Sequence, residues 1–128
     1  MSVSGGAGGP GAARAGRLDV HRDGGTLRVV LHGAVDLHVR EHDAPALWAQ
    51  LDEPGVRVVA VDASDVSFLD SSGLSVVVRL VRDAAELGLP VHVEALSRPV
   101  AELLDQTGVR AWMDDLAASS PGHGRTGG

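Results

Sequence analysis

Residues 58–74 constrain the fold most, because an apolar run there leads through a polar turn into the start of an amphipathic segment. The run predicts a strand over 56–62, and its near-continuous hydrophobicity is typical of a central strand covered on both faces. The turn ends in Asp70-Ser71-Ser72-Gly73, which opens the amphipathic segment. The predicted unit is a buried strand that delivers the Ser71 hydroxyl to the first turn of a helix. Backbone N–H groups are unpaired in that turn, so a phosphate could sit there.

The segment before this unit reads as a hairpin followed by a helix. Residues 18–20 and 26–32 predict two strands joined by a turn at 23–25, and Gly33 allows a bend before Asp36 ends the strand region. We expect an ordered helix from about Ala44, with 37–42 as a looser approach turn. Asp43 is a suitable cap for that helix, and Pro45 is tolerated only in its first turn.

The segment after it alternates helix and strand. The charges of 72–87 fall at helical spacing and favour a helix there, although its valine run would also suit a strand; the charged residues are Arg79, Arg82, Asp83 and Glu86. The opposite, apolar side of this helix comprises Leu74, Val77, Val78, Val81, Ala84 and Ala85.

Gly88 and Pro90 end this helix, and 90–95 is the next strand. Ser97 and Pro99 open another helix, which Gly108 ends. Residues 109–116 form a closing segment, a short strand or a helical turn, with Trp112 buried.

The predicted order is β-β-α-β-α-β-α. Strands that alternate with helices pair in parallel, so the fold class is α/β: a single domain with a small, mixed, mostly parallel sheet, an N-terminal hairpin and helices packed on the sheet. We expect the domain to span 17–118. The small and polar residues of 1–16 and 119–128 predict flexible tails at both ends.

Composition and charge argue against several classes of protein. The chain has no cysteine, which excludes disulfides and thiolate metal sites and fits a cytoplasmic location. The net charge is -6 and the 11 basic residues are scattered, which argues against a nucleic-acid partner. No apolar run is long enough to span a membrane. Nothing in the sequence demands more than a monomer. We expect neither a metal nor a cofactor.

Several motifs together resemble the STAS domain, and within it the anti-sigma factor antagonists. The similar segments are Gly33-Ala34-Val35-Asp36, the strand at 59–62, the signature Val66-Ser67-Phe68-Leu69-Asp70-Ser71-Ser72-Gly73-Leu74, the turn at 88–91, and Leu103-Leu104 with Thr107-Gly108-Val109. The resemblance covers about 17–116. It departs from the family where Asp43 and Pro45 fall inside the region of an otherwise unbroken first helix.

The resemblance implies a bacterial, non-enzymatic switch that regulates transcription, as in partner switching during a stress response. The serine that directly follows the aspartate, here Ser71, would be phosphorylated by an anti-sigma factor that is also a serine kinase. The unmodified protein would hold that anti-sigma factor and so free a sigma factor. A PP2C-type phosphatase would reset the switch.

The expected partner surface comprises Asp36, Asp70, Ser71, Ser72 and Gly73. Asp70 would orient the Ser71 hydroxyl or contact the kinase; the alternative is that it only ends a turn. Asp36 would lie at the same end of the sheet, or would simply cap the approach to the first helix. Ser71 would be the modified residue; the alternative is that it is an ordinary helix cap. Ser72 is a competing acceptor, although its expected role is to start the helix.

Other functions fit the sequence less well. His38 and His42 at helical spacing could hold a metal, but a solvated polar face is the favoured interpretation. The motif around Ser71 lacks the Gly-x-Ser-x-Gly of a hydrolase elbow, with only His92 left as a conceivable base. No phosphate-binding glycine loop with a lysine exists. The main alternative is a constitutive STAS adaptor, in a stress-signalling scaffold or a transporter-associated complex, whose serine needs no phosphate.

Overall fold

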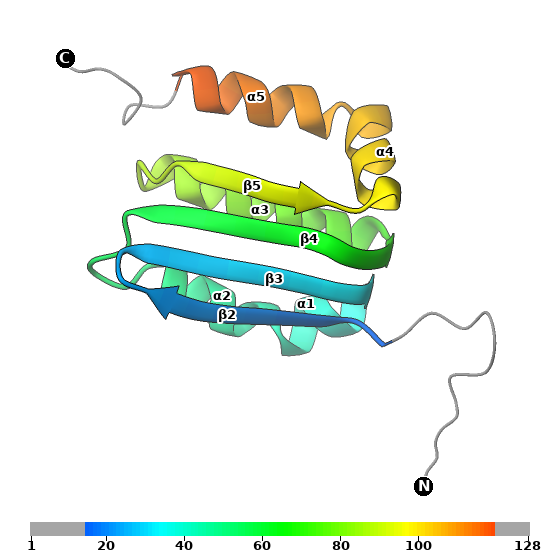
Figure 1. Ribbon diagram of the computed structural model, residues 1–128, viewed down its shortest axis with the longest axis horizontal. Helices are drawn as coiled ribbons and strands as arrows, with labels where there is room; N and C mark the ends of the chain where they lie inside the picture. The colour runs from blue at the N-terminus through cyan, green and yellow to red at the C-terminus, as the bar shows by residue number, and fades with distance from the viewer. Residues whose placement is uncertain (1–14, 120–128) are drawn as a thin grey trace, which may run out of the picture.

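The strands form a four-stranded sheet whose spatial order follows the chain (Figure 1). The computed structural model describes residues 15–119; the rest of the two predicted tails lies outside this range. The elements in chain order are β2 (Arg17–Asp23), β3 (Thr26–Val35), α1 (Leu37–His42), α2 (Ala44–Leu51), β4 (Val58–Leu69), α3 (Ser71–Glu86), β5 (Val91–Leu96), α4 (Arg98–Thr107) and α5 (Val109–Ser119). β2 pairs with β3 antiparallel, and the other two pairings are parallel. The predicted mixed sheet with an N-terminal hairpin is therefore confirmed.

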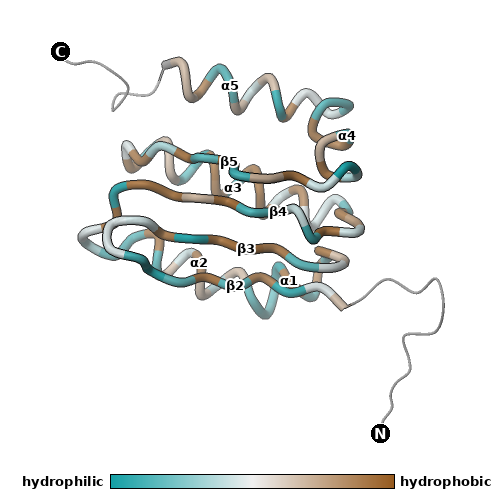
Figure 2. Tube along the Cα trace, in the orientation of Figure 1, coloured by the Kyte–Doolittle hydropathy of each residue, from teal (hydrophilic) through white to brown (hydrophobic). Residues whose placement is uncertain are grey.

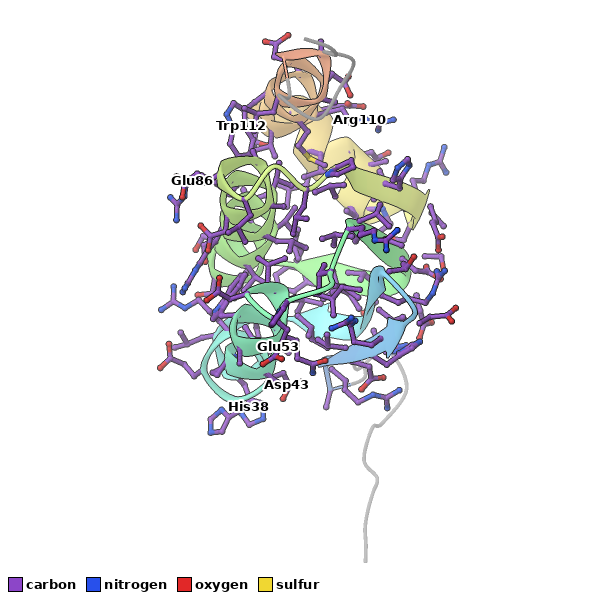
Figure 3. The ribbon with its side chains drawn as sticks, turned by 90° about the vertical axis from the view of Figure 1, so that its left-hand side faces the viewer. His38, Asp43, Glu53, Glu86, Arg110 and Trp112 are labelled. Atoms are coloured by element: carbon purple, nitrogen blue, oxygen red, sulfur yellow. The ribbon has the colours of Figure 1, made fainter. Side chains whose placement is uncertain are left out.

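The helices cover one face of the sheet and the β5 edge. Figure 3, viewed along the strands, shows α1, α2 and α3 on one side of the sheet, with α4 and α5 beyond β5. Alternate residues of β3 are buried toward the helices, and Figure 2 shows hydrophobic stretches along β3 and β4. The core is aliphatic, and its largest fully buried side chains are Leu27, Leu47 and Leu104 with four valines.

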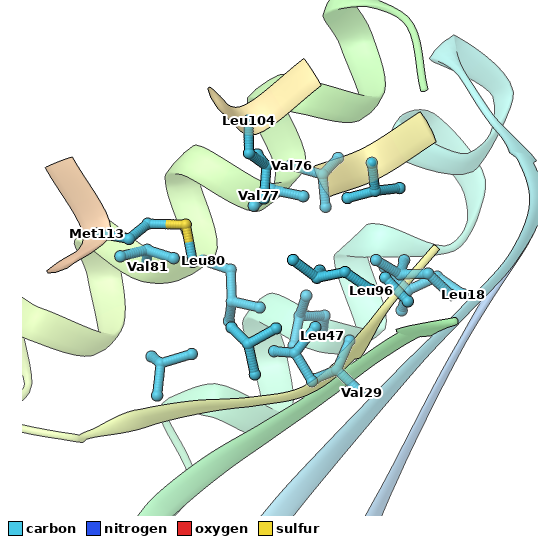
Figure 4. A pocket seen from close by; sticks show the side chains of 16 residues that line it. Leu18, Val29, Leu47, Val76, Val77, Leu80, Val81, Leu96, Leu104 and Met113 are labelled. Atoms are coloured by element: carbon cyan, nitrogen blue, oxygen red, sulfur yellow. The ribbon is translucent and has the colours of Figure 1, made fainter. Parts of the chain in front are cut away.

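A small gap lies in the core between the sheet and the helices. Its volume is about 20 Å³, and aliphatic side chains and Met113 line it (Figure 4). A water molecule would fit by size but would find no polar partner there. The gap is therefore a packing defect of an aliphatic core rather than a ligand site.

β4 continues through the predicted polar turn to Leu69, so the expectation of a strand ending at 62 was wrong. Val66 and Leu69 are buried on the helix side, and residues 65–69 pair with the end of β3. Shifts in register interrupt the simple two-residue alternation, one of them next to Gly33, whose φ is 64°. The extra residue at each shift belongs to β4, so β4 is the bulged strand, and β3 runs on through Gly33 instead of ending there in a bend. Such a bulge hides the strand pattern from a reading of the sequence.

The segment expected as a loose approach turn is the helix α1. Asp36 caps it, which gives residues 37–42 an ordered start. Asp43 was expected to cap α2, but its carboxylate makes no cap bond and instead accepts from the Leu18 N–H at 3.0 Å. Pro45 lies in the first turn of α2, as predicted. Asp43 thus separates the two short helices, and its side chain is hydrogen-bonded to the backbone of β2.

Ala15 precedes the predicted domain start but already contacts the sheet, where it forms an isolated bridge with Ala34. Gly16 permits this approach, because a Cβ there would lie 1.8 Å from the Ala34 carbonyl oxygen.

α3 begins one residue before the predicted start and ends one residue before the predicted end. Arg79, Arg82 and Glu86 are exposed as expected, and Arg79 Nε donates to Asp83 at 3.1 Å.

The buried face of α3 is rotated from the predicted one, since Val76 and Leu80 are fully buried and were not on it. Val81 and Ala84 are buried as predicted, whereas Leu74, Val77, Val78 and Ala85 are only half-buried.

The C-terminal part contains a second correction. Gly108 ends α4 with φ at 78°, as predicted. The closing segment, however, is an 11-residue helix, and Trp112 is half-buried rather than buried. Val109 and Met113 pack against the core instead, so the aliphatic residues and not the indole hold α5.

Candidate functional site

Asp36 and Asp70 lie side by side where β3 and β4 end. Val35 of β3 pairs with Leu69 of β4, and each aspartate directly follows the last residue of its strand. The Asp70 N–H also donates to the Val35 carbonyl at 3.3 Å. The expectation that both aspartates share one end of the sheet is confirmed.

Both carboxylates cap helices. Asp36 Oδ1 accepts from the N–H groups of His38 and Val39, at 3.0 and 3.4 Å. Asp70 Oδ1 accepts from the Gly73 N–H at 2.9 Å. Within residues 15–119, no hydrogen bond joins the Asp70 carboxylate to the Ser71 hydroxyl. Asp70 therefore fixes the start of α3, and through it the position of Ser71.

Ser71 is the first residue of α3 and is exposed. Its hydroxyl makes no hydrogen bond with any other described residue. The helix cap is Asp70, not Ser71 or Ser72, so the expectation that Ser72 starts the helix was off by one residue. In the first turn, the N–H groups of Ser71 and Ser72 have no carbonyl four residues earlier within the helix. An anion on the Ser71 oxygen would meet these donors and the positive end of the α3 dipole.

Ser72 and Gly73 are less accessible than Ser71. Ser72 is half-buried, and its carbonyl accepts from the Ser75 hydroxyl at 2.6 Å. Gly73 is buried, and a Cβ there would lie 2.2 Å from the Val35 carbonyl oxygen. Gly73 therefore permits the close contact between α3 and β3 and offers a partner no direct surface.

Two exposed apolar residues flank the aspartates and were not anticipated from the sequence. Leu37, directly after Asp36, is 49% exposed, and Phe68, two residues before Asp70, is 50% exposed. Phe68 faces away from the helices because its neighbour Leu69 faces the core. The alternation around Leu69 could have revealed Phe68, had 63–69 been recognised as strand. Large exposed hydrophobic residues beside polar groups are typical of a protein-binding surface.

The other predicted candidates lie apart from Ser71. His92 pairs with Ala60, whereas Ser71 follows the far end of β4. About nine residues of strand lie between these levels, roughly 25–30 Å, so His92 cannot act as its base. His38 and His42 stack with ring centroids 4.1 Å apart, and His42 Nδ1 lies 3.0 Å from the His38 carbonyl oxygen. Residues 15–119 contain no cluster of three or more metal-ligating side chains.

The uncovered face of the sheet carries a polar network. His32 lies between two carboxylates, with Nδ1 2.9 Å from Asp65 and Nε2 3.3 Å from Asp19. Hydrogen bonds from the Ser64 hydroxyl and N–H lower the pKa of Asp62 below its usual value. These contacts link strands β2, β3 and β4 without involving Ser71.

The comparisons with known proteins agree with this architecture. The STAS domain family model matches residues 17–120. Among solved structures, the anti-sigma factor antagonist SpoIIAA in its unphosphorylated form has a TM-score of 0.64 at 20% identity, covering 74% of this chain and 84% of that one. The Bacillus protein in its phosphorylated form gives 0.62 at 19%, covering 74% and 86%. An antagonist from Mycobacterium paratuberculosis gives 0.63 at 19%, covering 83% and 94%. At these identities the likeness shows a shared fold.

Among the described residues, no helix is both long and apolar enough to cross a bilayer.

Proposed function

The chain belongs to the STAS domain family, and we propose that it is an anti-sigma factor antagonist controlled by phosphorylation of Ser71. The unmodified protein binds an anti-sigma factor that is also a serine kinase, and thereby frees a sigma factor. Phosphorylation releases the partner, and a PP2C-type phosphatase restores binding. The protein acts as a monomeric binding switch in the bacterial cytoplasm, in a stress response, and catalyses no reaction of its own.

The observation that carries this proposal is the position of Ser71. Its hydroxyl is exposed and lacks a hydrogen-bond partner among the described residues. Ser71 directly follows Asp70, and the exposed apolar residues Leu37 and Phe68 lie next to Asp36 and two residues before Asp70. A kinase can reach such a hydroxyl without unfolding the chain. A partner that binds the unmodified surface would cover it.

A phosphate acts here through charge rather than through a change of fold. It adds about 1.5 to 2 negative charges at neutral pH. The N–H groups of the first turn of α3 tolerate that charge within the protein. A docked partner would instead meet new bulk and charge beside Asp36 and Asp70. A loss of about 3–4 kcal/mol would weaken binding several-hundredfold. The similar TM-scores to SpoIIAA in both phosphorylation states support a switch that keeps the fold.

The residues of the expected surface divide by role in this proposal. Ser71, Asp36 and Asp70 contact the partner, while Ser72 and Gly73 set the position of the helix start. Leu37 and Phe68 supply an apolar contact that was not expected from the sequence. Phe68→Ala should weaken partner binding by about tenfold or more, because central aromatic residues carry much of the energy of an interface.

Mass spectrometry after incubation with ATP and the serine kinases encoded beside this gene tests the proposal. One added phosphate that is lost in Ser71→Ala is the expected result. Ser71→Asp should weaken binding of the same kinase while leaving the melting temperature nearly unchanged, and Ser71→Ala should bind permanently. Ser75→Asp is the matched control, since Ser75 is exposed one turn further along α3. Equal binding of wild type and Ser71→Asp, with no phosphate added, would identify a constitutive adaptor instead.

A further inference from the structure

β5 is the outer strand of the sheet, and half of its backbone groups face away from β4. The Val59 N–H donates to the Pro90 carbonyl and the Ser97 N–H donates to the Ala63 carbonyl, so both ends of β5 bond inward. N–H and C=O groups alternate between the two sides of a strand, and no described strand pairs with the outer side of β5. The strand contains neither proline nor lysine, two residues that commonly protect such an edge.

A groove of about 490 Å³ runs along this edge, with α5 as its opposite wall. Figure 1 shows α5 running beside β5. Val93 and Leu96 of β5, Leu104 of α4 and Met113 of α5 supply apolar lining. None of the described side chains of α5 is fully buried, and none on β5 is. A groove with an unpaired strand edge on one side and a helix on the other suits an extended peptide that adds a strand.

The charges around the groove select among extended peptides. Glu94 already pairs with Arg28. Arg110, at the start of α5, is exposed and has no ion-pair partner among the described residues. Figure 3 shows Arg110 on the side of α5 above β5 and Trp112 on the side above α3. Asp114, one turn further along α5, also lines the groove, so an acidic side chain on the bound peptide would find an available cation only at the Arg110 end.

We propose that the β5–α5 groove binds an extended segment of a partner protein, with aliphatic residues at alternate positions and an acidic residue that pairs with Arg110. The backbone of the segment bonds to the outer edge of β5, and its aliphatic side chains contact Leu96 and Met113. This surface is separate from Ser71, which lies at the start of α3 and does not line the groove. The protein would thus hold a second partner whatever the phosphorylation state of Ser71.

Two capped peptides, Thr-Val-Thr-Val-Thr-Asp and Asp-Thr-Val-Thr-Val-Thr, are suitable probes, because the direction of the added strand is open. Titration into the full ¹⁵N-labelled chain should move the amide signals of β5 and α5, with one order binding more tightly. Peptides methylated at alternate backbone nitrogens should lose detectable binding. Arg110→Glu should weaken the preferred peptide by about fivefold, and replacing its aspartate with lysine should restore binding to that variant. Arg98→Glu, at an exposed arginine of α4 outside the groove, should leave the affinity for the preferred peptide unchanged.

Other results would overturn the proposal. These are absence of binding at millimolar peptide, shifts confined to other surfaces, or equal binding of methylated peptides. Signals of β5 that move on dilution of the protein alone would assign the groove to a second copy. Nuclear Overhauser contacts from residues 120–128 to β5 would assign it to this chain's own C-terminal segment. Ser71→Asp should leave peptide affinity unchanged, so this test and that of the switch can fail independently.

Discussion

Replacing Gly73 with alanine should destabilise the protein, although the same change stabilises an ordinary helix. Gly73 lies in the first turn of α3 with no unfavourable φ, so alanine there should gain about 0.5–1 kcal/mol from helix propensity. The surroundings oppose this gain. The added Cβ would lie 2.2 Å from the Val35 carbonyl oxygen and 2.7 Å from Leu69 Cδ1.

The expected cost follows from which atoms must move. The Leu69 methyl can rotate away, but the Val35 carbonyl belongs to the central strand β3, and its oxygen also accepts from the Asp70 N–H. The start of α3 must therefore shift outward, which also disturbs the cap bond from Gly73 to Asp70. Overpacking of this kind costs about 1–3 kcal/mol. The upper end of that range, about 3 kcal/mol, applies because the added Cβ meets a backbone atom. After the propensity gain of about 1 kcal/mol, we expect a net loss of about 2 kcal/mol, or about 10 °C in melting temperature for a domain of this size.

Urea unfolding followed by circular dichroism measures this loss. Gly88→Ala and Gly108→Ala are matched controls, because an added Cβ there meets no atom within 4 Å while φ is 74° and 78°. Their cost should be only about 1 kcal/mol, from the left-handed backbone alone. A Gly73→Ala protein as stable as wild type, or more stable, would refute the contact argument. The close approach to Val35 would then no longer explain how Gly73 positions Ser71.

Helix caps and charges lead to three further predictions. Asp70→Ala and Asp36→Ala should each lower the free energy of unfolding by about 1 kcal/mol in urea titrations, because each removes a cap, and Asn should largely preserve it. Ser97→Ala should do the opposite of a normal cap deletion and leave stability equal or higher by calorimetry, since the Ser97 hydroxyl is buried without a partner among the described residues. The lowered pKa of Asp62 means that its contribution to stability is present above its unfolded pKa and is lost as pH falls through the folded pKa. NMR titration should show that pKa rising toward the usual value in Ser64→Ala, and an unchanged value would contradict the assigned cause.

The candidate site was predictable where local chemistry decides it. Asp70-Ser71-Ser72-Gly73 after an apolar strand is sufficient to place a serine in the first turn of a helix, and both aspartates follow parallel strands that end at one edge. Phe68 and Leu37 were missed, because their exposure depends on bulges and on a short helix that the sequence does not display. Val76 and Leu80 were missed for a related reason, since the charged stripe of α3 defines its buried face only approximately.

The sequence by itself determined the α/β order, the aliphatic core and the position of Ser71, because periodicity, caps and turn residues act over a few neighbours along the chain. Tertiary structure alone decided that β4 runs on to Leu69, that Asp43 bonds to β2 rather than capping α2, and that β5 faces a groove instead of another strand. These outcomes depend on which distant segments compete for the same backbone groups and the same apolar surface. Such competition is settled only when the whole chain packs.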